Sequence, residues 1–380
     1  MNHEGIMKAV LGGAAILLFC ACSAAQESPL YTRWENFTTA NGMPDDKVFQ
    51  ATVDGDRVWA GTENGLVLIE KGKIQKVYGT EDGLANRVVT GVAIDPATGD
   101  VWLSTFGGLS RLSGGEFRNY KNLTSGLAND IVYAVAVQNE FVWAATTAGI
   151  SRLNTRTGEW SIFSEKNAPL HEPWSYGIAV TEKKVYFAVW GGGLLEYDIA
   201  GGWWKPHNDP DGEMEMVLFQ NQGLIHDIVS NVAYNHETQM VWASTYFGLS
   251  GYDGHNWHNY LSTDSALASD FINAVQSRGD DVWACTDKGL SYLNFKTGEW
   301  ITYRPAVDGK AGEIVITSAD KKVEHRQTGT ALAHNYILNL AFQGDDIWVA
   351  TAKGLSHGLR EPKRQSNKEG NRNEHKPASR

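Results

Sequence analysis

A short motif recurs seven times in this chain, and this repeat limits the possible folds more than any other feature. The first copy is VWAGTENGL, which begins at Val58. Each copy starts with an aliphatic residue followed by an aromatic residue, and each ends with Gly before Leu or Ile. The other six copies begin at Val101, Val142, Val185, Val241, Val282 and Ile347.

The aromatic residue of the motif sets the period of the repeat. It is Trp59, Trp102, Trp143, Tyr186, Trp242, Trp283 and Trp348. Four of the six spacings between these positions are 41 or 43 residues, and the other two are 56 and 65. A period of about 40–45 residues made only of short strands is typical of a β-propeller, because each blade buries its faces against its neighbours.

Each repeat contains four predicted strands. In the second repeat they are VVTGVAID from Val88, the motif itself, GLSRL from Gly108 and GEFRNY from Gly115. The Gly of the motif permits a tight turn between antiparallel strands, and the large aromatic residue fills the space between stacked blades. No stretch shows helical periodicity. We therefore predict an all-β fold, a seven-bladed β-propeller with four antiparallel strands per blade.

The two ends of the repeat predict how the ring closes. The seventh repeat has no fourth strand, because the segment 360–380 is polar and carries seven basic and three acidic residues. The segment TRWENFT, Thr32–Thr38, resembles the fourth strands of the other repeats. We expect it to complete the last blade, which removes two exposed sheet edges. The predicted propeller spans 32–359, and 360–380 is a disordered basic tail.

The N-terminal segment predicts export. Residues 1–21 form a signal peptide whose apolar run is too short to cross a bilayer. The run ends in Phe-Cys-Ala directly before Cys22, which resembles a bacterial lipobox. This resemblance implies lipidation of Cys22 and a linker at 22–31, and the uncharged Ser23 resembles the signal for transfer to the outer membrane. The alternative is an ordinary signal peptide cut near Ala25.

An aligned dipeptide precedes the first strand of every repeat, so its residues should ring one mouth of the central channel. The pairs are Asp45-Asp46, Asn86-Arg87, Asn129-Asp130, Glu172-Pro173, His226-Asp227, Ser269-Asp270 and His334-Asn335. One interpretation is an acidic ring that binds a cation or a polyol. The other is turn chemistry, in which these side chains accept hydrogen bonds from backbone N–H groups two residues on.

Three dipeptide residues are candidate metal ligands. Glu172, His226 and His334 replace the usual Asn or Ser, and two histidines with a carboxylate can hold a divalent metal. They come from repeats four, five and seven, so they need not converge on one ion. The alternative is that they are solvated loop residues, and no cofactor other than such a metal is expected.

Aromatic side chains in the motif turns form a candidate ligand platform on the same face. We predict a binding site for a carbohydrate or another hydroxylated small molecule there, since aromatic rings in solvated turns are not needed for blade packing. The alternative is that the rings pack between blades. Insertions at 201–224 and 305–333 should emerge as loops on this face. The predicted ligand residues are Phe106, Trp174, Trp190, Tyr246, His226, Asp227, Asp270 and His334.

The segments from Asn41 and from Asp82, each running through one motif, resemble the two-component regulator propeller repeat. That family implies the propeller fold and occurs in sensors of hybrid histidine kinases and in free-standing lipoproteins. This chain has no kinase or DNA-binding segment, and its net charge of −11 makes nucleic acid an unexpected partner. No catalytic motif nominates a nucleophile with its base.

Three functions follow from this sequence. The first is a non-enzymatic envelope lipoprotein that binds a small-molecule ligand or an envelope protein. The second is a metal-assisted lyase or hydrolase that uses the His and Glu residues at the channel mouth. The third is a structural subunit of an envelope complex that docks through the basic tail.

Overall fold

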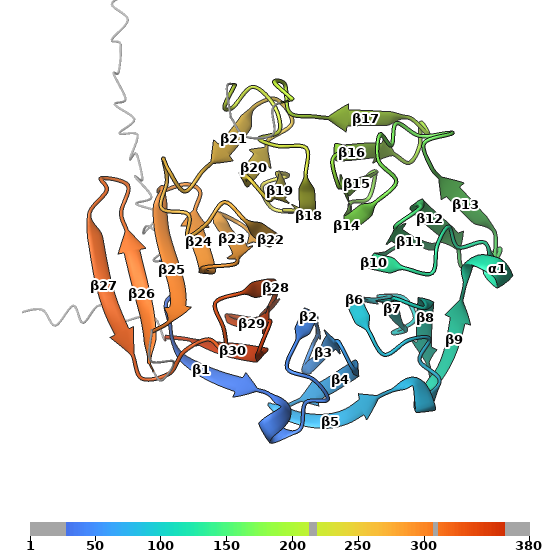
Figure 1. The fold of residues 1–380 in the computed structure, drawn as a ribbon, viewed down its shortest axis with the longest axis horizontal. Helices are drawn as coiled ribbons and strands as arrows, with labels where there is room; N and C mark the ends of the chain where they lie inside the picture. The colour runs from blue at the N-terminus through green and yellow to red at the C-terminus, as the bar shows by residue number, and fades with distance from the viewer. Residues whose placement is uncertain (1–27, 213–218, 307–310, 362–380) are drawn as a thin grey trace, which may run out of the picture.

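A computed structural model of the protein describes residues 28–212, 219–306 and 311–361. Seven antiparallel sheets stand in a ring around a central axis (Figure 1), which confirms the predicted seven-bladed β-propeller. The predicted signal peptide, Cys22 and most of the basic tail lie outside the described residues. In the part of the chain that the structure describes, no helix is long and apolar enough to cross a membrane.

Blades one to three follow the predicted four-stranded plan. Blade one holds β2 (Val48–Asp54), β3 (Arg57–Thr62), β4 (Gly65–Glu70) and β5 (Lys73–Tyr78). Blade two holds β6 (Val89–Ile94), β7 (Val101–Thr105), β8 (Gly108–Ser113) and β9 (Glu116–Tyr120). Blade three holds β10 (Val132–Gln138), β11 (Phe141–Thr146), β12 (Gly149–Asn154) and β13 (Trp160–Phe163).

Blades four and five repeat this plan, and the described helices are single turns between blades. Blade four holds β14 (Ser175–Val180), β15 (Lys184–Val189), β16 (Gly193–Asp198) and β17 (Trp204–His207). Blade five holds β18 (Val229–Tyr234), β19 (Val241–Thr245), β20 (Gly248–Tyr252) and β21 (Trp257–Tyr260). The helical turns are η1 (Thr39–Asn41), η2 (Thr80–Asp82) and α1 (Asn122–Ser125).

Blades six and seven depart from the plan in strand number and in chain order. Blade six holds β22 (Ile272–Arg278), β23 (Asp281–Thr286), β24 (Gly289–Asn294), β25 (Glu299–Pro305), β26 (Gly312–Thr317) and β27 (Val323–Thr328). Blade seven holds β28 (Ile337–Gln343), β29 (Asp346–Thr351), β30 (Gly354–Arg360) and β1 (Tyr31–Phe37).

The repeated motif forms the second strand of each blade and the turn that follows it. Its seven aromatic residues are all buried between blades, each no more than 5% exposed. In the turn of blade one, Gly65 has a φ of +121°, and an added Cβ would lie 2.6 Å from the carbonyl oxygen of Tyr78. The N–H of Gly65 donates to the carbonyl oxygen of Arg87 in blade two. The motif therefore packs neighbouring blades together through its aromatic residue and forms a tight turn through its glycine.

The N-terminal strand closes the ring as predicted. Strand β1 pairs antiparallel with β30, and Tyr31 lies opposite Arg360. Trp34 and Tyr31 are buried against Trp283 and Tyr303 of blade six. Aromatic packing across the junction therefore reinforces the backbone hydrogen bonds that join the two ends of the chain.

The insertion at 305–333 does not emerge as a loop on the dipeptide face, so that prediction was wrong. Residues 312–328 of the insertion form a hairpin of β26 and β27, which widens blade six at the outer rim (Figure 1). The core residue Ile314 packs in the cluster of Tyr31 and Trp34, and Thr330 accepts a hydrogen bond from the N–H of Trp34 at 2.8 Å. The insertion thus covers the closing strand.

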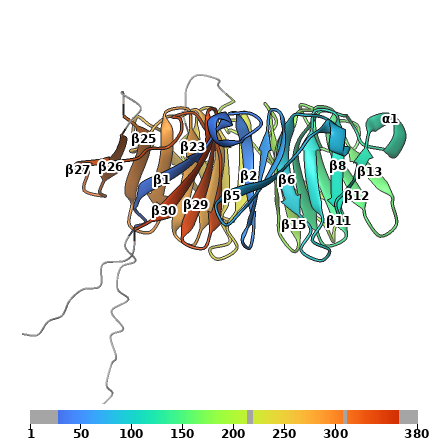
Figure 2. The same cartoon turned by 90° about the horizontal axis from the view of Figure 1, so that it is seen from below.

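Both described chain ends leave the propeller on the same face (Figure 2). The N–H of Glu361 donates to the carbonyl oxygen of Leu30 at 2.9 Å, and the Tyr31 hydroxyl donates to the carbonyl oxygen of Asp345 at 2.8 Å. Asp345 precedes β29, whereas the motif turn follows β29. The chain ends therefore lie on the face opposite the motif turns.

Candidate functional site

The first strand of every blade carries an irregularity in its pairing at the same position. The register shifts between Val132 and Ala134 in blade three, and it shifts at the equivalent place in the six other blades. A β-bulge of this kind redirects the side chain of the extra residue. The seven bulge residues are Phe49, Thr90, Tyr133, Tyr176, Ser230, Asn273 and Leu338.

The bulge residues line a cavity at the mouth of the central channel, which we call the central cavity. Its volume is about 610 Å³, and all seven blades contribute to its wall. Phe106, Tyr246 and Ala352 from three motif turns complete the rim. The repeat therefore builds one shared site at its centre from residues that are more than 200 positions apart in the sequence.

Seven aromatic side chains form a continuous series of ring contacts around this mouth, and we call the series the aromatic arc. Neighbouring ring centroids lie between 4.0 and 6.3 Å apart. The closest pair is Tyr246 with Phe271, whose rings are stacked. In order around the mouth, the arc consists of Phe106, Tyr133, Tyr176, Trp190, Tyr246, Phe271 and Tyr336.

The sequence identified three members of the arc and missed four. Phe106, Trp190 and Tyr246 were predicted from the motif turns, and the structure brings them into one series of contacts. Tyr133 and Tyr176 could have been found, since both stand third after the aligned dipeptide. Their direction depends on the bulge, which strand alternation does not predict.

Phe271 and Tyr336 were also missed, although both directly follow a dipeptide. Trp174, which was predicted, occupies the same aligned position in blade four but does not join the arc. Its side chain is 47% exposed, and its carbonyl oxygen accepts a hydrogen bond from the N–H of Trp190 at 2.9 Å. The structure thus places Trp174 beside the arc.

Among the described residues, the first residue of the aligned dipeptide caps the turn before the inner strand in six of the seven blades. The Nδ1 atoms of His226 and His334 accept hydrogen bonds from the N–H of Ile228 and Tyr336, each at 3.0 Å. Asp45, Asn86, Asn129 and Ser269 accept the equivalent bond in their blades. This geometry supports the turn-chemistry interpretation of these positions.

The second residue of the dipeptide, where it is Asp, holds the segment that arrives from the previous blade. Asp227 accepts a hydrogen bond from the N–H of Asp209 at 2.8 Å. Asp270 accepts a hydrogen bond from the N–H of Ser262 at 2.6 Å and another from the Ser262 hydroxyl. These carboxylates therefore have structural partners, and their role in binding a ligand stays a prediction.

The three metal candidates are not brought together as one site. His226 is buried, and its ring stacks on Phe247 with centroids 4.1 Å apart. Glu172 is exposed beside the motif turn of blade four. Burial and the nearby Lys353 lower the pKa of His334. Among the described residues, no group of three or more His, Cys, Asp or Glu side chains has the geometry to hold a metal ion.

The wall of the central cavity is aromatic and amide-rich rather than acidic. Among its described lining residues, Lys47 is the one charged side chain. Burial and the neighbouring Tyr133 raise the pKa of Tyr176, and burial also raises the pKa of Tyr246. These phenols are therefore protonated at neutral pH and can both donate and accept hydrogen bonds.

Two asparagines in this wall have amide oxygens without a hydrogen-bond partner among the described residues. They are Asn231 and Asn339, and the Asn339 side chain is 7% exposed. Both oxygens are buried, so these two atoms are not exposed to the cavity. The cavity wall thus combines aromatic rings with amide side chains.

Comparisons with known proteins bear on the fold of this chain. No protein-family model matches the sequence, and no curated protein matches it. Among solved structures, the chain is similar to the extracellular domain assigned to a hybrid two-component system of B. thetaiotaomicron, with a TM-score of 0.64 and 16% identity. That similarity covers 88% of this chain and 42% of the other, so this chain spans less than half of the solved protein.

Two further solved structures match over almost their whole length. Virginiamycin B lyase from Staphylococcus aureus has a TM-score of 0.60 and 14% identity, with 86% of this chain and 99% of that chain covered. BamB from Moraxella catarrhalis has a TM-score of 0.53 and 17% identity, with 89% of this chain and 99% of that chain covered. At such low identities these similarities establish the propeller fold, which hosts many unrelated functions.

Proposed function

We propose that this protein is a non-enzymatic binding lipoprotein of the bacterial cell envelope, and that its central cavity binds a neutral, hydroxylated ring compound such as a carbohydrate. The observation that carries this proposal is the aromatic arc, which continues from blade two to blade seven around the channel mouth. Blade packing does not require rings at these positions, since the bulge residue is Thr90 in blade two and Ser230 in blade five, and Lys47 follows the dipeptide of blade one.

The chemistry of the wall favours a neutral sugar over a charged ligand. Aromatic faces bind the C–H faces of a sugar ring, while phenol and amide groups bind its hydroxyls. Asn231 and Asn339 contribute amide side chains to the wall, and Tyr176 and Tyr246 contribute phenols. A metal-bound or anionic substrate would need ligands of another kind, and Lys47 is the single charged group in the described wall.

The structure gives the lyase alternative no supporting observation. His226 and His334 each cap a turn through Nδ1. They come from blades five and seven, whereas Glu172 comes from blade four. The similarity to virginiamycin B lyase concerns the fold and transfers no reaction to this chain. We therefore propose binding rather than catalysis.

An envelope location is supported by the N-terminal sequence and by solved structures that have a similar fold. One of those similar structures is an extracellular domain. The described chain begins at Ser28, six residues after the predicted lipidated Cys22, on the face opposite the motif turns. An anchor at Cys22 would therefore direct the central cavity away from the membrane, toward ligands or partner proteins.

Binding of defined neutral oligosaccharides to the purified protein tests this proposal. Cellotetraose, maltotetraose, xylotetraose and mannotetraose are suitable probes for calorimetry or tryptophan fluorescence. We expect at least one to bind, and Tyr246→Ala to weaken that binding about tenfold or more. Trp203→Ala is the matched control, because Trp203 is 47% exposed and lies outside the cavity. Equal losses for both variants, or no binding by any of the four, would contradict the proposal.

A further inference from the structure

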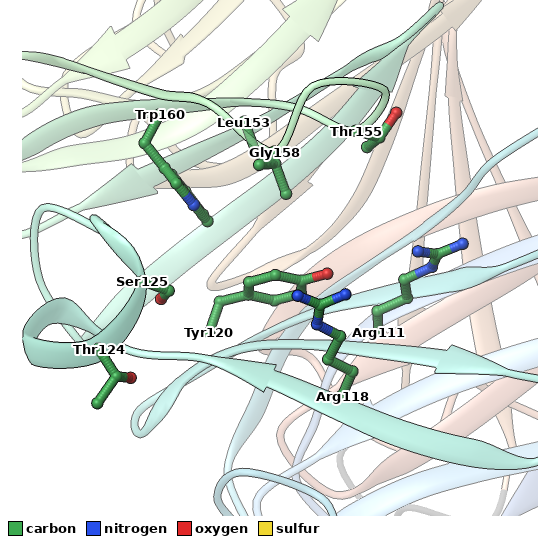
Figure 3. Close-up of a pocket in the computed structure, with 9 residues that line it drawn as sticks. All are labelled: Arg111, Arg118, Tyr120, Thr124, Ser125, Leu153, Thr155, Gly158 and Trp160. Atoms are coloured by element: carbon green, nitrogen blue, oxygen red, sulfur yellow. The ribbon is translucent and has the colours of Figure 1, made fainter.

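A second hollow lies at the outer rim, between blades two and three, and we call it the outer groove. Its volume is about 320 Å³, which is at the lower end for small-molecule sites. Strands β8 and β9 form one wall, and α1, β12 and β13 form the other. Figure 3 shows the guanidinium of Arg118 beside the ring of Tyr120, with Arg111 next to it and Trp160 across the groove.

The aromatic floor of the groove is part of the repeat, so it does not by itself indicate a ligand. Tyr120 and Trp160 have ring centroids 5.8 Å apart. Tyr78 and Phe117 make the same contact between blades one and two, also at 5.8 Å. Any specific function of the outer groove must therefore come from its polar residues.

Two arginines lie in this groove, and Arg111 has a counterpart in Arg152 of blade three. Arg111 donates to the Asp100 carboxylate through Nε, at 2.8 Å, and through a second guanidinium nitrogen. Burial alone would raise the pKa of Asp100, but hydrogen bonds from Ser113 and Arg111 outweigh it and lower the pKa. Asp100 therefore stays ionised and neutralises Arg111.

Arg118 has no such partner. Its guanidinium carbon lies 5.1 Å from the centroid of the Tyr120 ring, and no described carboxylate forms an ion pair with it. In blade one, the aligned Lys76 also lies over a tyrosine, but it forms an ion pair with Asp82 at 4.0 Å. The outer groove thus carries one uncompensated positive charge above an aromatic ring.

Hydroxyl groups border the same groove. Thr124 and Ser125 come from α1, and Thr155 comes from the turn after β12 (Figure 3). The Ser125 hydroxyl donates to the carbonyl oxygen of Lys121 at 2.7 Å, which leaves its own oxygen as an acceptor. The groove therefore offers the half-buried ring of Trp160, hydroxyl acceptors and one guanidinium within a volume suited to a sugar unit.

We propose that the outer groove binds an acidic sugar, a pyranose that carries a carboxylate. Arg118 pairs with the carboxylate, since a guanidinium makes strong charge-assisted hydrogen bonds to that group. The half-buried Trp160 contacts the ring. The hydroxyls of Ser125 and Thr155 donate to backbone carbonyl oxygens, so their own oxygens accept hydrogen bonds from the sugar hydroxyls. This site is distinct from the central cavity and does not depend on the function proposed for it.

Binding of trigalacturonic acid and of its methyl ester, measured by calorimetry on the purified protein, tests this inference. The ester keeps the rings and removes the negative charges. We expect the acid to bind, with affinity that falls as salt is raised, and the ester to bind at least about tenfold more weakly. Equal binding of the acid and the ester, or no binding of the acid, would overturn the inference.

Matched variants locate the binding. Arg118→Gln should weaken binding of the acid about tenfold or more, because it removes a charged hydrogen-bond donor. Lys76→Gln removes the aligned cation of blade one, and Tyr246→Ala alters the central cavity, so both should bind normally. Unchanged binding by Arg118→Gln, or displacement of the acid by inorganic phosphate at equal concentration, would overturn the proposed sugar site.

Discussion

The ring centroids of Tyr133 and Tyr176 lie 4.4 Å apart, although the two residues belong to neighbouring blades. Both occupy the bulge position of an inner strand, and both line the central cavity. The β-bulge that every blade repeats therefore places different side chains around the same mouth of the central channel. Blades two, five and six use Thr90, Ser230 and Asn273 at this position to bind the next blade.

We predict that Trp190→Ala weakens ligand binding at the central cavity by about 1–3 kcal/mol, the scale of one aromatic contact in a binding site. Trp190 lies between Tyr176 and Tyr246, with centroids 5.4 and 4.9 Å away, so its removal interrupts the aromatic arc. Titration of an oligosaccharide that binds the unaltered protein provides the measurement.

Thermal melting separates this effect from a general loss of stability. Trp190 is half-buried in a turn, so we expect Trp190→Ala to lower the melting temperature only slightly. Trp203→Ala is the control for loss of an exposed indole outside the cavity. A large fall in melting temperature with unchanged binding would show that Trp190 serves packing alone.

The sequence predicted the ring because the motif residues have one structural role in every blade. The motif tryptophans are buried in all six blades that contain them, and Tyr186 takes the place in the other. The bulge was not predictable from alternation, and Tyr133 and Tyr176 were missed for that reason. The hairpin in 305–333 was missed although residues 313–317, EIVIT, have strand composition, since the spacing alone indicated a loop.

We predict that deletion of residues 31–38 destabilises the protein far more than deletion of residues 363–380. The first deletion removes β1, exposes the edge of β30 and opens the cluster around Trp283 and Tyr303. The second removes a polar, basic segment that follows the closed ring. Melting temperatures of the two variants provide the test, and equal values would contradict closure by the N-terminal strand.

We predict that the exported protein carries a lipid on Cys22. The apolar run that ends directly before this residue motivates the prediction, and the described chain begins close enough to Cys22 to be held near a membrane. Mass spectrometry of the purified N-terminus provides the measurement, and Cys22→Ser is the control that should release the protein from membranes. An unmodified N-terminus that begins after Cys22 would refute the prediction.

We predict that Gly65→Ala lowers the free energy of unfolding by at least about 2 kcal/mol, because strained backbone and steric overlap act together. The φ of Gly65 is +121°, and an added Cβ would lie 2.6 Å from the Tyr78 carbonyl oxygen. Gly114→Ala is the control, since its φ is +60° and no atom lies within 4 Å of an added Cβ. Urea unfolding should show a loss of about 1 kcal/mol for the control, and equal losses would argue against steric restriction in the motif turn.

The last prediction concerns a buried ionic group in blade four and its dependence on pH. Glu196 is 3% exposed, and its carboxylate lies 2.5 Å from Lys184 Nζ and 3.2 Å from His207 Nε2. Burial alone would raise the pKa of Glu196, but the hydrogen bonds and charges of His207 and Lys184 outweigh it and lower the pKa to about 2. The ordinary value, expected in the unfolded chain, is about 4.5.

Because the folded pKa is the lower one, ionised Glu196 stabilises the fold fully above about pH 4.5, and this contribution is lost as the pH falls toward about 2. Glu196→Gln breaks the buried group and should cost about 3 kcal/mol at neutral pH. The difference from the unaltered protein should shrink at pH 3. Urea unfolding at both pH values provides the measurement, with the exposed Glu182→Gln as control. A difference that stayed constant from pH 7 to pH 3 would show that Glu196 contributes through packing rather than through its charge.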